Sequence, residues 1–175
     1  IAVLIQGMAS VWVTVKWPMI GQLRSRLDLE GMRKLLWGRV WLETLTFILM
    51  AIAALIFLPI LLRLDVIQKE VLPSPWFLVL LFNFFLETQM IVWGTFLTTE
   101  NKVPTLWPIA ASNLVTLVLV CVLASYSSFG LGIFAVAPLI SGSLFNYWFW
   151  PRAGARNLRT TWFRYMFFPR RLATA

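Results

Sequence analysis

The sequence predicts an all-α membrane protein, a polytopic helix bundle with about five transmembrane helices. The first observation is composition: 60% of the 175 residues are hydrophobic and only 13% are charged, whereas soluble domains are roughly 45–50% apolar and about 25% charged. The second is the recurrence of apolar stretches of about 20 residues, long enough to cross a roughly 30 Å hydrocarbon core as helices. The third is that no stretch alternates apolar and polar residues as a membrane β-strand does, so helices must satisfy the backbone.

Each predicted span is a long apolar run bounded by residues that break helices. The predicted spans cover residues 1–20, 35–62, 75–98, 105–126 and 131–150. The breakers between them include Gly31, Pro73 and Pro104, which favour turns. We therefore expect a transmembrane bundle over residues 1–150. Residues 151–175 interleave arginine with aromatic residues, a mixture typical of a segment lying in the membrane interface, and we expect a basic, aromatic cytoplasmic tail.

The basic residues predict the orientation of the bundle. Six Lys and Arg residues lie in or beside the first connector, one lies in the third connector and six lie in the tail, whereas the second connector holds two and the fourth none. Five spans place the first connector, the third connector and the tail on the same side. Loops rich in Lys and Arg stay in the cytoplasm, so we predict a multi-pass protein of the cell's inner, cytoplasmic membrane with a cytoplasmic C-terminus.

Composition and motifs also exclude classes of function. The chain has no histidine, the residue that most often ligates zinc or haem or acts as a base. It shows no nucleophile elbow, no glycine-rich phosphate loop and no paired carboxylates on one span. We therefore expect no catalytic residues, no metal and no cofactor. The net charge of +8 flanks membrane spans, so we expect membrane lipids and not nucleic acid as its partner.

An acidic residue, Glu87, lies in the middle of the third predicted span, and Asn83 lies one helical turn before it. Residues four apart share a helix face. A charge at mid-bilayer costs at least about 2.5 kcal/mol, so this face should meet a cavity or a partner. Two interpretations stay open: Glu87 is a coupling-ion site that takes up a proton or cation, or it is a hydrogen-bonding anchor between helices.

Other polar residues in the spans have simpler interpretations. Arg39 precedes Glu43 by one turn, which predicts a neutralising pair, although a role at the mouth of a cavity is the alternative. Lys16 either extends its ammonium to the interface or lines a cavity. Polar residues in the last two spans, such as Ser112 and Asn146, favour close helix packing, with bending of proline-containing helices as the alternative.

One longer stretch resembles a known family. Residues 86–104, LETQMIVWGTFLTTENKVP, are similar to a helix of oligosaccharide and O-antigen flippases, with an acid, a helix ending in F-[IL]-T-T and then N-x-[VI]-P. Downstream, the Ser112–Asn113 step, the SSFGLG turn at 127–132 and the WFWP finish at 148–151 resemble the last two helices of that family. Upstream, KWPMIGQLRSRLDLEGMRKLLW resembles its basic cytoplasmic connector.

The resemblance implies that the chain is the C-terminal part of a transporter of the multidrug/oligosaccharidyl-lipid/polysaccharide flippase superfamily. Such transporters have two bundles around a central cavity, so the N-terminal helices of the full-length protein would be missing from this chain. The implied activity is flipping of an undecaprenyl-pyrophosphate oligosaccharide by alternating access. The implied cavity residues are Lys16, Arg24, Arg26 and Arg39 at the cytoplasmic mouth, and Asn83 and Glu87 deeper in.

Two alternatives to this function remain. The first is a cation-coupled exporter of small drugs from the same superfamily, which a cavity dominated by carboxylates would favour. The second is a membrane scaffold subunit that transports nothing, in which the polar residues only hold helices together.

Overall fold

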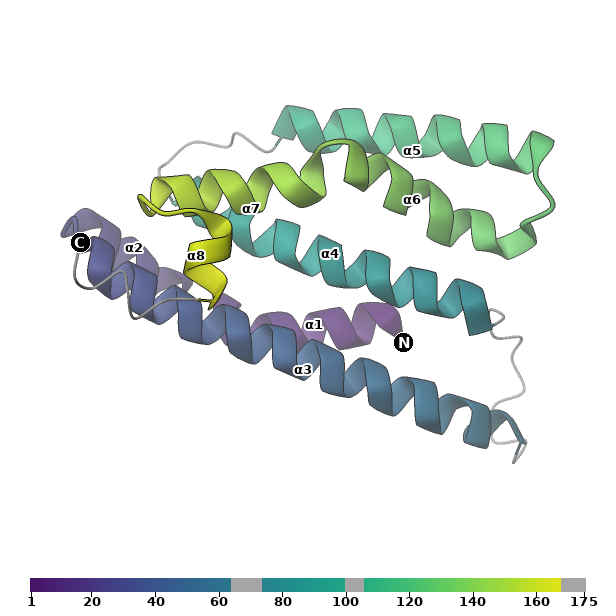
Figure 1. Cartoon of the computed structure of the whole chain (residues 1–175), viewed down its shortest axis with the longest axis horizontal. Coiled ribbons are helices and arrows are strands. Elements are labelled where there is room, and N and C mark those ends of the chain that lie inside the picture. The colour runs from purple at the N-terminus through teal and green to yellow at the C-terminus, as the bar shows by residue number, and fades with distance from the viewer. Residues whose placement is uncertain (64–73, 100–105, 168–175) are drawn as a thin grey trace.

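The computed structural model describes residues 1–63, 74–99 and 106–167. Every regular element in these ranges is helical (Figure 1), which confirms the all-α prediction for this part of the chain. Several predicted features lie outside the described residues. These are Lys69, Lys102, Arg170 and Arg171 of the charge pattern, and Asn101, Val103 and Pro104 of the flippase-like motif.

The N-terminal part consists of α1 (Ala2–Thr14), α2 (Trp17–Ser25) and α3 (Leu29–Arg63). The first two helices together make one span-length segment, Ala2–Ser25, and Pro18 in the first turn of α2 marks the step between them. Helix α3 has 35 residues, which at a rise of about 1.5 Å each is roughly 50 Å, longer than the hydrocarbon core. It packs along α1, so only part of its apolar surface is available for contact with lipid.

Helix α4 (Ser74–Thr98) is the centre of the bundle and α5 (Leu106–Tyr126) is its periphery. Figure 1 shows α4 between α1 and α3 on one side and α6 and α7 on the other. In the most apolar stretch of each helix, 44% of the residues are buried in α4, whereas 0% are buried in α5. Helix α5 therefore offers its apolar surface to the membrane, whereas α4 carries the polar residues that the bundle encloses.

The fifth span is broken. A short 3₁₀ turn (Gly130–Gly132) leads into α6 (Ile133–Leu144), and α7 (Asn146–Asn157) follows at an angle of 41°. Phe145 has φ −145° and ψ −56°, so the helical hydrogen bonding stops there. Within the described residues, four helical segments are long and apolar enough to span a membrane, and the bent pair adds a fifth if it is counted as one span, in agreement with the prediction of about five. Helix α7 continues past residue 150 to Asn157.

A last short helix, α8 (Trp162–Phe167), folds back onto α3 and α4. The main-chain carbonyl of Met166 accepts hydrogen bonds from the indole N–H groups of Trp37 and Trp41, both at 3.2 Å. The Tyr165 hydroxyl donates to the carbonyl of Arg33 at 3.0 Å. Burial raises the pKa of Tyr165, although the nearby Arg33 charge acts in the opposite direction. The first part of the predicted tail is thus packed against the bundle.

Candidate functional site

A polar cavity of about 200 Å³ lies between α4, α5, α6 and α7. Each helix contributes a polar side chain to its lining: Asn83 and Glu87 from α4, Ser112 from α5, Ser141 from α6 and Tyr147 from α7. Glu87 is near the middle of α4, about 17–20 Å along the helix axis from either end. The cavity therefore lies at the depth where lipid alone would exclude polar groups.

Hydrogen bonds join the outer helices of the cavity. The Ser141 hydroxyl donates to the Ser112 carbonyl at 2.7 Å, and the Asn146 amide donates to the Ser112 hydroxyl at 2.8 Å. The Asn146 carbonyl oxygen in turn accepts the indole N–H of Trp150 at 3.0 Å. Asn146 is the first residue of α7, so the break in the fifth span is what turns its amide towards α5.

Tyr147 connects the broken span to α4. Its hydroxyl donates to the Asn83 side-chain oxygen at 2.6 Å, and Asn83 is only 4% exposed. The ring passes directly over Gly142, where any added Cβ would overlap it. Glycine is therefore required at position 142 for close approach of the Tyr147 ring.

Glu87 lies where the two sides of the bundle meet. The Gln6 amide of α1 interacts with its carboxyl group, and Tyr147 of α7 is close enough to couple to its charge. The Gln6 amide nitrogen is buried and has no hydrogen-bond partner within the described part of the chain. Glu87 itself is half-buried and borders the cavity. Glu87 therefore offers the cavity a carboxylate.

The structure brings together two of the six site residues predicted from sequence. Asn83 and Glu87 share the polar cavity. Arg24 instead donates to the Asn157 side chain at 3.0 Å and to the Phe96 carbonyl at 3.4 Å, and so stabilises the C-terminal ends of α4 and α7. Arg39 lines a shallow groove between α2 and α3.

The remaining two predicted cations lie at the ends of α2. Lys16 is half-buried at its start, and Arg26 is exposed at its end. Among the described residues that line the polar cavity, Glu87 supplies the charge and no Lys or Arg contributes.

Glu43 corrects one prediction. Its side chain is 0% exposed, and neither carboxyl oxygen has a hydrogen-bond partner in the described structure. The predicted neutralising pair with Arg39 was therefore wrong. Glu43 continues the buried stripe of Val40 and Phe47 on α3, whereas the long Arg39 side chain extends to the groove beside α2.

Sequence reasoning missed Tyr147 and interpreted Ser112, Ser141 and Asn146 as packing residues. Their role as packing residues is real, because their hydrogen bonds hold α5, α6 and α7 together. The same groups also line the cavity. Two sequence features pointed to this part of the site: Tyr147 follows the polar residue Asn146, and the last two spans contain proline. Neither feature predicts the angle at which the fifth span is broken.

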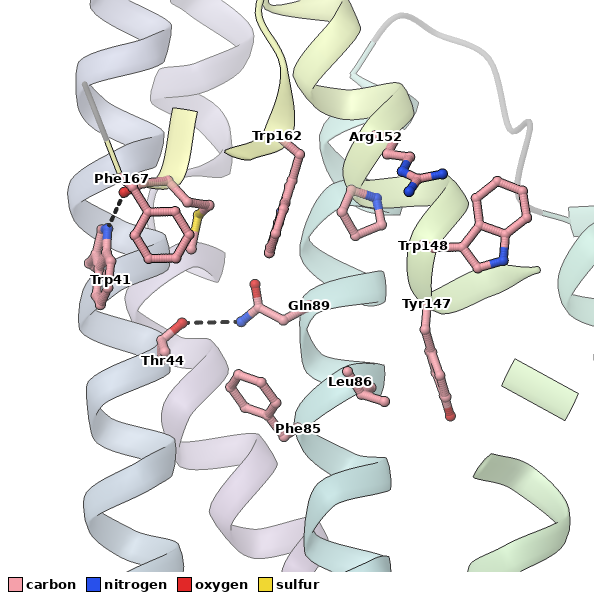
Figure 2. A pocket seen from close by; sticks show the side chains of 12 residues that line it. Trp41, Thr44, Phe85, Leu86, Gln89, Tyr147, Trp148, Arg152, Trp162 and Phe167 are labelled. Carbon is pink, nitrogen blue, oxygen red and sulfur yellow. Dashed lines mark hydrogen bonds between the residues drawn. The ribbon is translucent and has the colours of Figure 1, made fainter. Parts of the chain in front are cut away.

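A second pocket, the aromatic pocket, has a volume of about 370 Å³ and lies between α3, α4, α7 and α8 (Figure 2). Its aromatic lining comes from all four helices. The lining includes Trp41, Phe85, Trp148, Trp162 and Phe167. Polar groups are few: the Gln89 amide donates to the Thr44 hydroxyl at 3.2 Å on its inner wall, and Arg152 lies at its rim beside Trp148.

No protein-family model matches the chain, and neither the curated proteins nor the solved structures give a match. The likeness to flippases therefore depends on the sequence motifs and their order. The structure adds a polar cavity with one carboxylate at mid-span depth, formed where a broken helix meets the central helix.

Proposed function

We propose that this chain is the C-terminal part of a polysaccharide flippase, which moves an undecaprenyl-pyrophosphate-linked oligosaccharide from the cytoplasmic to the outer leaflet of the inner membrane by alternating access. The observation that carries the proposal is the broken fifth span, which brings Asn146 and Tyr147 to the Asn83–Glu87 face of α4. Discontinuous helices that present polar groups near the bilayer midplane are typical of substrate sites in transporters.

The chemistry of the lining suits the sugar part of such a substrate. A hydrated oligosaccharide can cross the bilayer only if other groups replace its hydrogen bonds to water. Amides and hydroxyls of Asn83, Asn113, Ser112, Thr116 and Tyr147 line the cavity and can donate to or accept from sugar hydroxyls. The cavity in this chain holds about 200 Å³, so we propose that a first bundle supplies the rest.

The cations at the helix ends would serve the diphosphate. Lys34 and Arg39 line the groove beside α2, and the positive-inside rule predicts that this end of the bundle lies in the cytoplasm, where the substrate would be made. In this proposal the diphosphate stays at the cationic ends and the sugar enters the neutral cavity. Arg24 would hold α4 and α7 in place without touching the substrate.

A second candidate function is a cation-coupled exporter of small drugs. The observation in its favour is that the charge on the described lining of the polar cavity is the carboxylate of Glu87. A site with one acid and no base attracts a cationic ligand or a coupling ion. The two functions therefore differ in the ligand expected in the cavity: a neutral sugar for the flippase and a cation for the exporter.

The test is transport by the protein that contains this chain, reconstituted in liposomes. Fluorescent polyprenyl-diphosphate oligosaccharide should move between leaflets, and Glu87→Gln should slow it. Glu30→Gln, which changes an exposed carboxylate at the start of α3, is the matched control and should have no effect. Uptake of a cationic dye driven by a proton or sodium gradient, with no lipid movement, would replace the first function by the second. If correctly folded protein moves neither substrate, both transport functions are excluded and the scaffold interpretation is the one that is left.

A further inference from the structure

A third pocket lies at the corner between α7 and α8 and is basic. It has a volume of about 360 Å³ and is lined by Arg156, Arg159, Arg164, Thr160 and Thr161. No acidic residue lines this corner pocket. Within the described part of the chain, neither Arg156 nor Arg159 forms an ion pair, and both side chains are exposed. Arg156 and Arg159 thus bring two exposed positive charges to this corner.

The backbone of Arg159 adds a second observation. Its φ is +53°, in the left-handed region that costs an L side chain roughly 1 kcal/mol relative to glycine. The residue closes α7 in a Schellman motif, with Arg159 N–H bonded to the Arg156 carbonyl at 2.8 Å and Thr160 N–H to the Ala155 carbonyl at 3.0 Å. Glycine is the usual residue there, yet this chain places a guanidinium that lines the basic corner.

The aromatic pocket borders the same corner. Arg152, one helical turn before Arg156, lines its rim, with its guanidinium 5.3 Å from the Trp148 ring centroid. Trp162, directly after Thr161, forms another wall (Figure 2). A ligand with an anionic head at the corner could therefore extend an apolar chain into the aromatic pocket without leaving this end of the bundle.

We propose that the α7–α8 corner binds one anionic phospholipid. Arg156 and Arg159 hold the headgroup phosphate, the Thr160 hydroxyl donates to it, and one acyl chain enters the aromatic pocket. Guanidinium groups bind phosphate by paired, charge-assisted hydrogen bonds, and basic pockets at the cytoplasmic side of membrane bundles bind lipid headgroups in this way. The site requires no transport activity, so it stands apart from the proposed function.

Native mass spectrometry of the full chain in detergent tests the site. The probes are dioleoyl phosphatidylglycerol, dioleoyl phosphatidylcholine and inorganic phosphate. Phosphatidylglycerol should bind most tightly, and the Arg156→Gln/Arg159→Gln double variant should weaken it at least roughly tenfold, since each surface cation contributes about fivefold to anionic lipid binding. Gln22→Glu/Ser25→Glu lowers the net charge by the same amount at exposed positions of α2 and should change this binding less than about twofold.

Two further variants separate binding from folding. Arg159→Gly relieves the left-handed backbone, so it should raise thermal stability while weakening phosphatidylglycerol binding. Leu27 has φ +57° in the same motif at the end of α2, so Leu27→Gly should raise stability equally and leave binding unchanged. Leu86→Trp fills the aromatic pocket. It should weaken the binding of phosphatidylglycerol but not that of inorganic phosphate.

Three results would overturn the proposal. An equal loss of binding in the Gln22→Glu/Ser25→Glu variant would show that net charge, and not the corner, attracts the lipid. Full competition by inorganic phosphate would show a phosphate site with no role for the acyl chain. Unchanged binding in Arg156→Gln/Arg159→Gln would exclude the corner altogether.

Discussion

Two carboxylates on neighbouring helices, Glu87 and Glu43, have opposite surroundings. Glu87 is half-buried, borders a polar cavity and has Gln6 and Tyr147 beside it. Glu43 is 0% exposed, and neither of its oxygens has a hydrogen-bond partner in the described structure. The sequence suggests the reverse, with Glu87 as the deep, costly charge and Glu43 as a shallow residue neutralised by Arg39.

The difference teaches that depth along a span and burial between helices are separate quantities. Position in the sequence places Glu87 at the middle of α4, but the broken fifth span opens a cavity beside it. Glu43 lies nearer the start of its predicted span, 35–62, yet its side chain is fully buried where α1 and α4 pack on α3. Whether an acid is accessible thus follows from the packing between helices and not from its position along one helix.

The largest expected effect is on stability, at Glu43. Glu43→Met keeps a similar unbranched shape and removes two oxygens that lack partners. We expect the free energy of unfolding to rise by about 3 kcal/mol, because each buried unpaired polar atom costs roughly 1–3 kcal/mol. Unfolding in mixed detergent micelles measures it. Glu87→Met should change stability less, because the cavity already offers this carboxyl polar surroundings; a larger gain at Glu87 would reverse the comparison.

The second largest effect on stability is expected at Gly142, where the Tyr147 ring packs closely against the main chain. A methyl group at Gly142 would overlap the Tyr147 ring, so Gly142→Ala should lower the free energy of unfolding by about 2 kcal/mol. It should also separate Tyr147 from Asn83. Gly7 on α1 has nothing near an added Cβ, so Gly7→Ala should be neutral or slightly stabilising. Equal effects in the two variants would argue against the packing of the ring over Gly142.

A smaller effect is expected from one hydrogen bond of the cavity. Tyr147→Phe removes the donor to the Asn83 oxygen and leaves a buried acceptor without its partner. The loss should be about 1 kcal/mol, measured by the same unfolding experiment. Tyr126, 88% exposed at the end of α5, provides the control: Tyr126→Phe should leave the free energy of unfolding unchanged.

Sequence predicted the helices well because lipid leaves the backbone few choices. The predicted spans over 35–62, 75–98 and 105–126 agree closely with α3, α4 and α5. The i, i+4 relation also predicted correctly that Asn83 and Glu87 share a face.

The rest of the site depends on contacts between helices, which spacing along one helix does not reveal. The hydrogen bond from Tyr147 to Asn83 joins residues 64 apart in the sequence, and the turn at Phe145 that makes it possible has no distinctive local pattern. Arg24 shows the same limit. It looked like a substrate-binding cation, and instead it contacts Asn157 and Phe96, distant residues on α7 and α4.

Cysteine labelling tests the comparison between the two carboxylates most directly. The single native cysteine, Cys121, is exposed, so Glu87→Cys and Glu43→Cys are each made in a Cys121→Ser background. A small, charged, water-soluble thiol reagent is added to the protein in liposomes, and unfolded samples of both variants serve as the reactivity control. Glu87→Cys should react in the folded protein, and Glu43→Cys only after unfolding. Equal labelling of the two, or labelling of Glu43→Cys alone, would contradict a water-accessible cavity at Glu87.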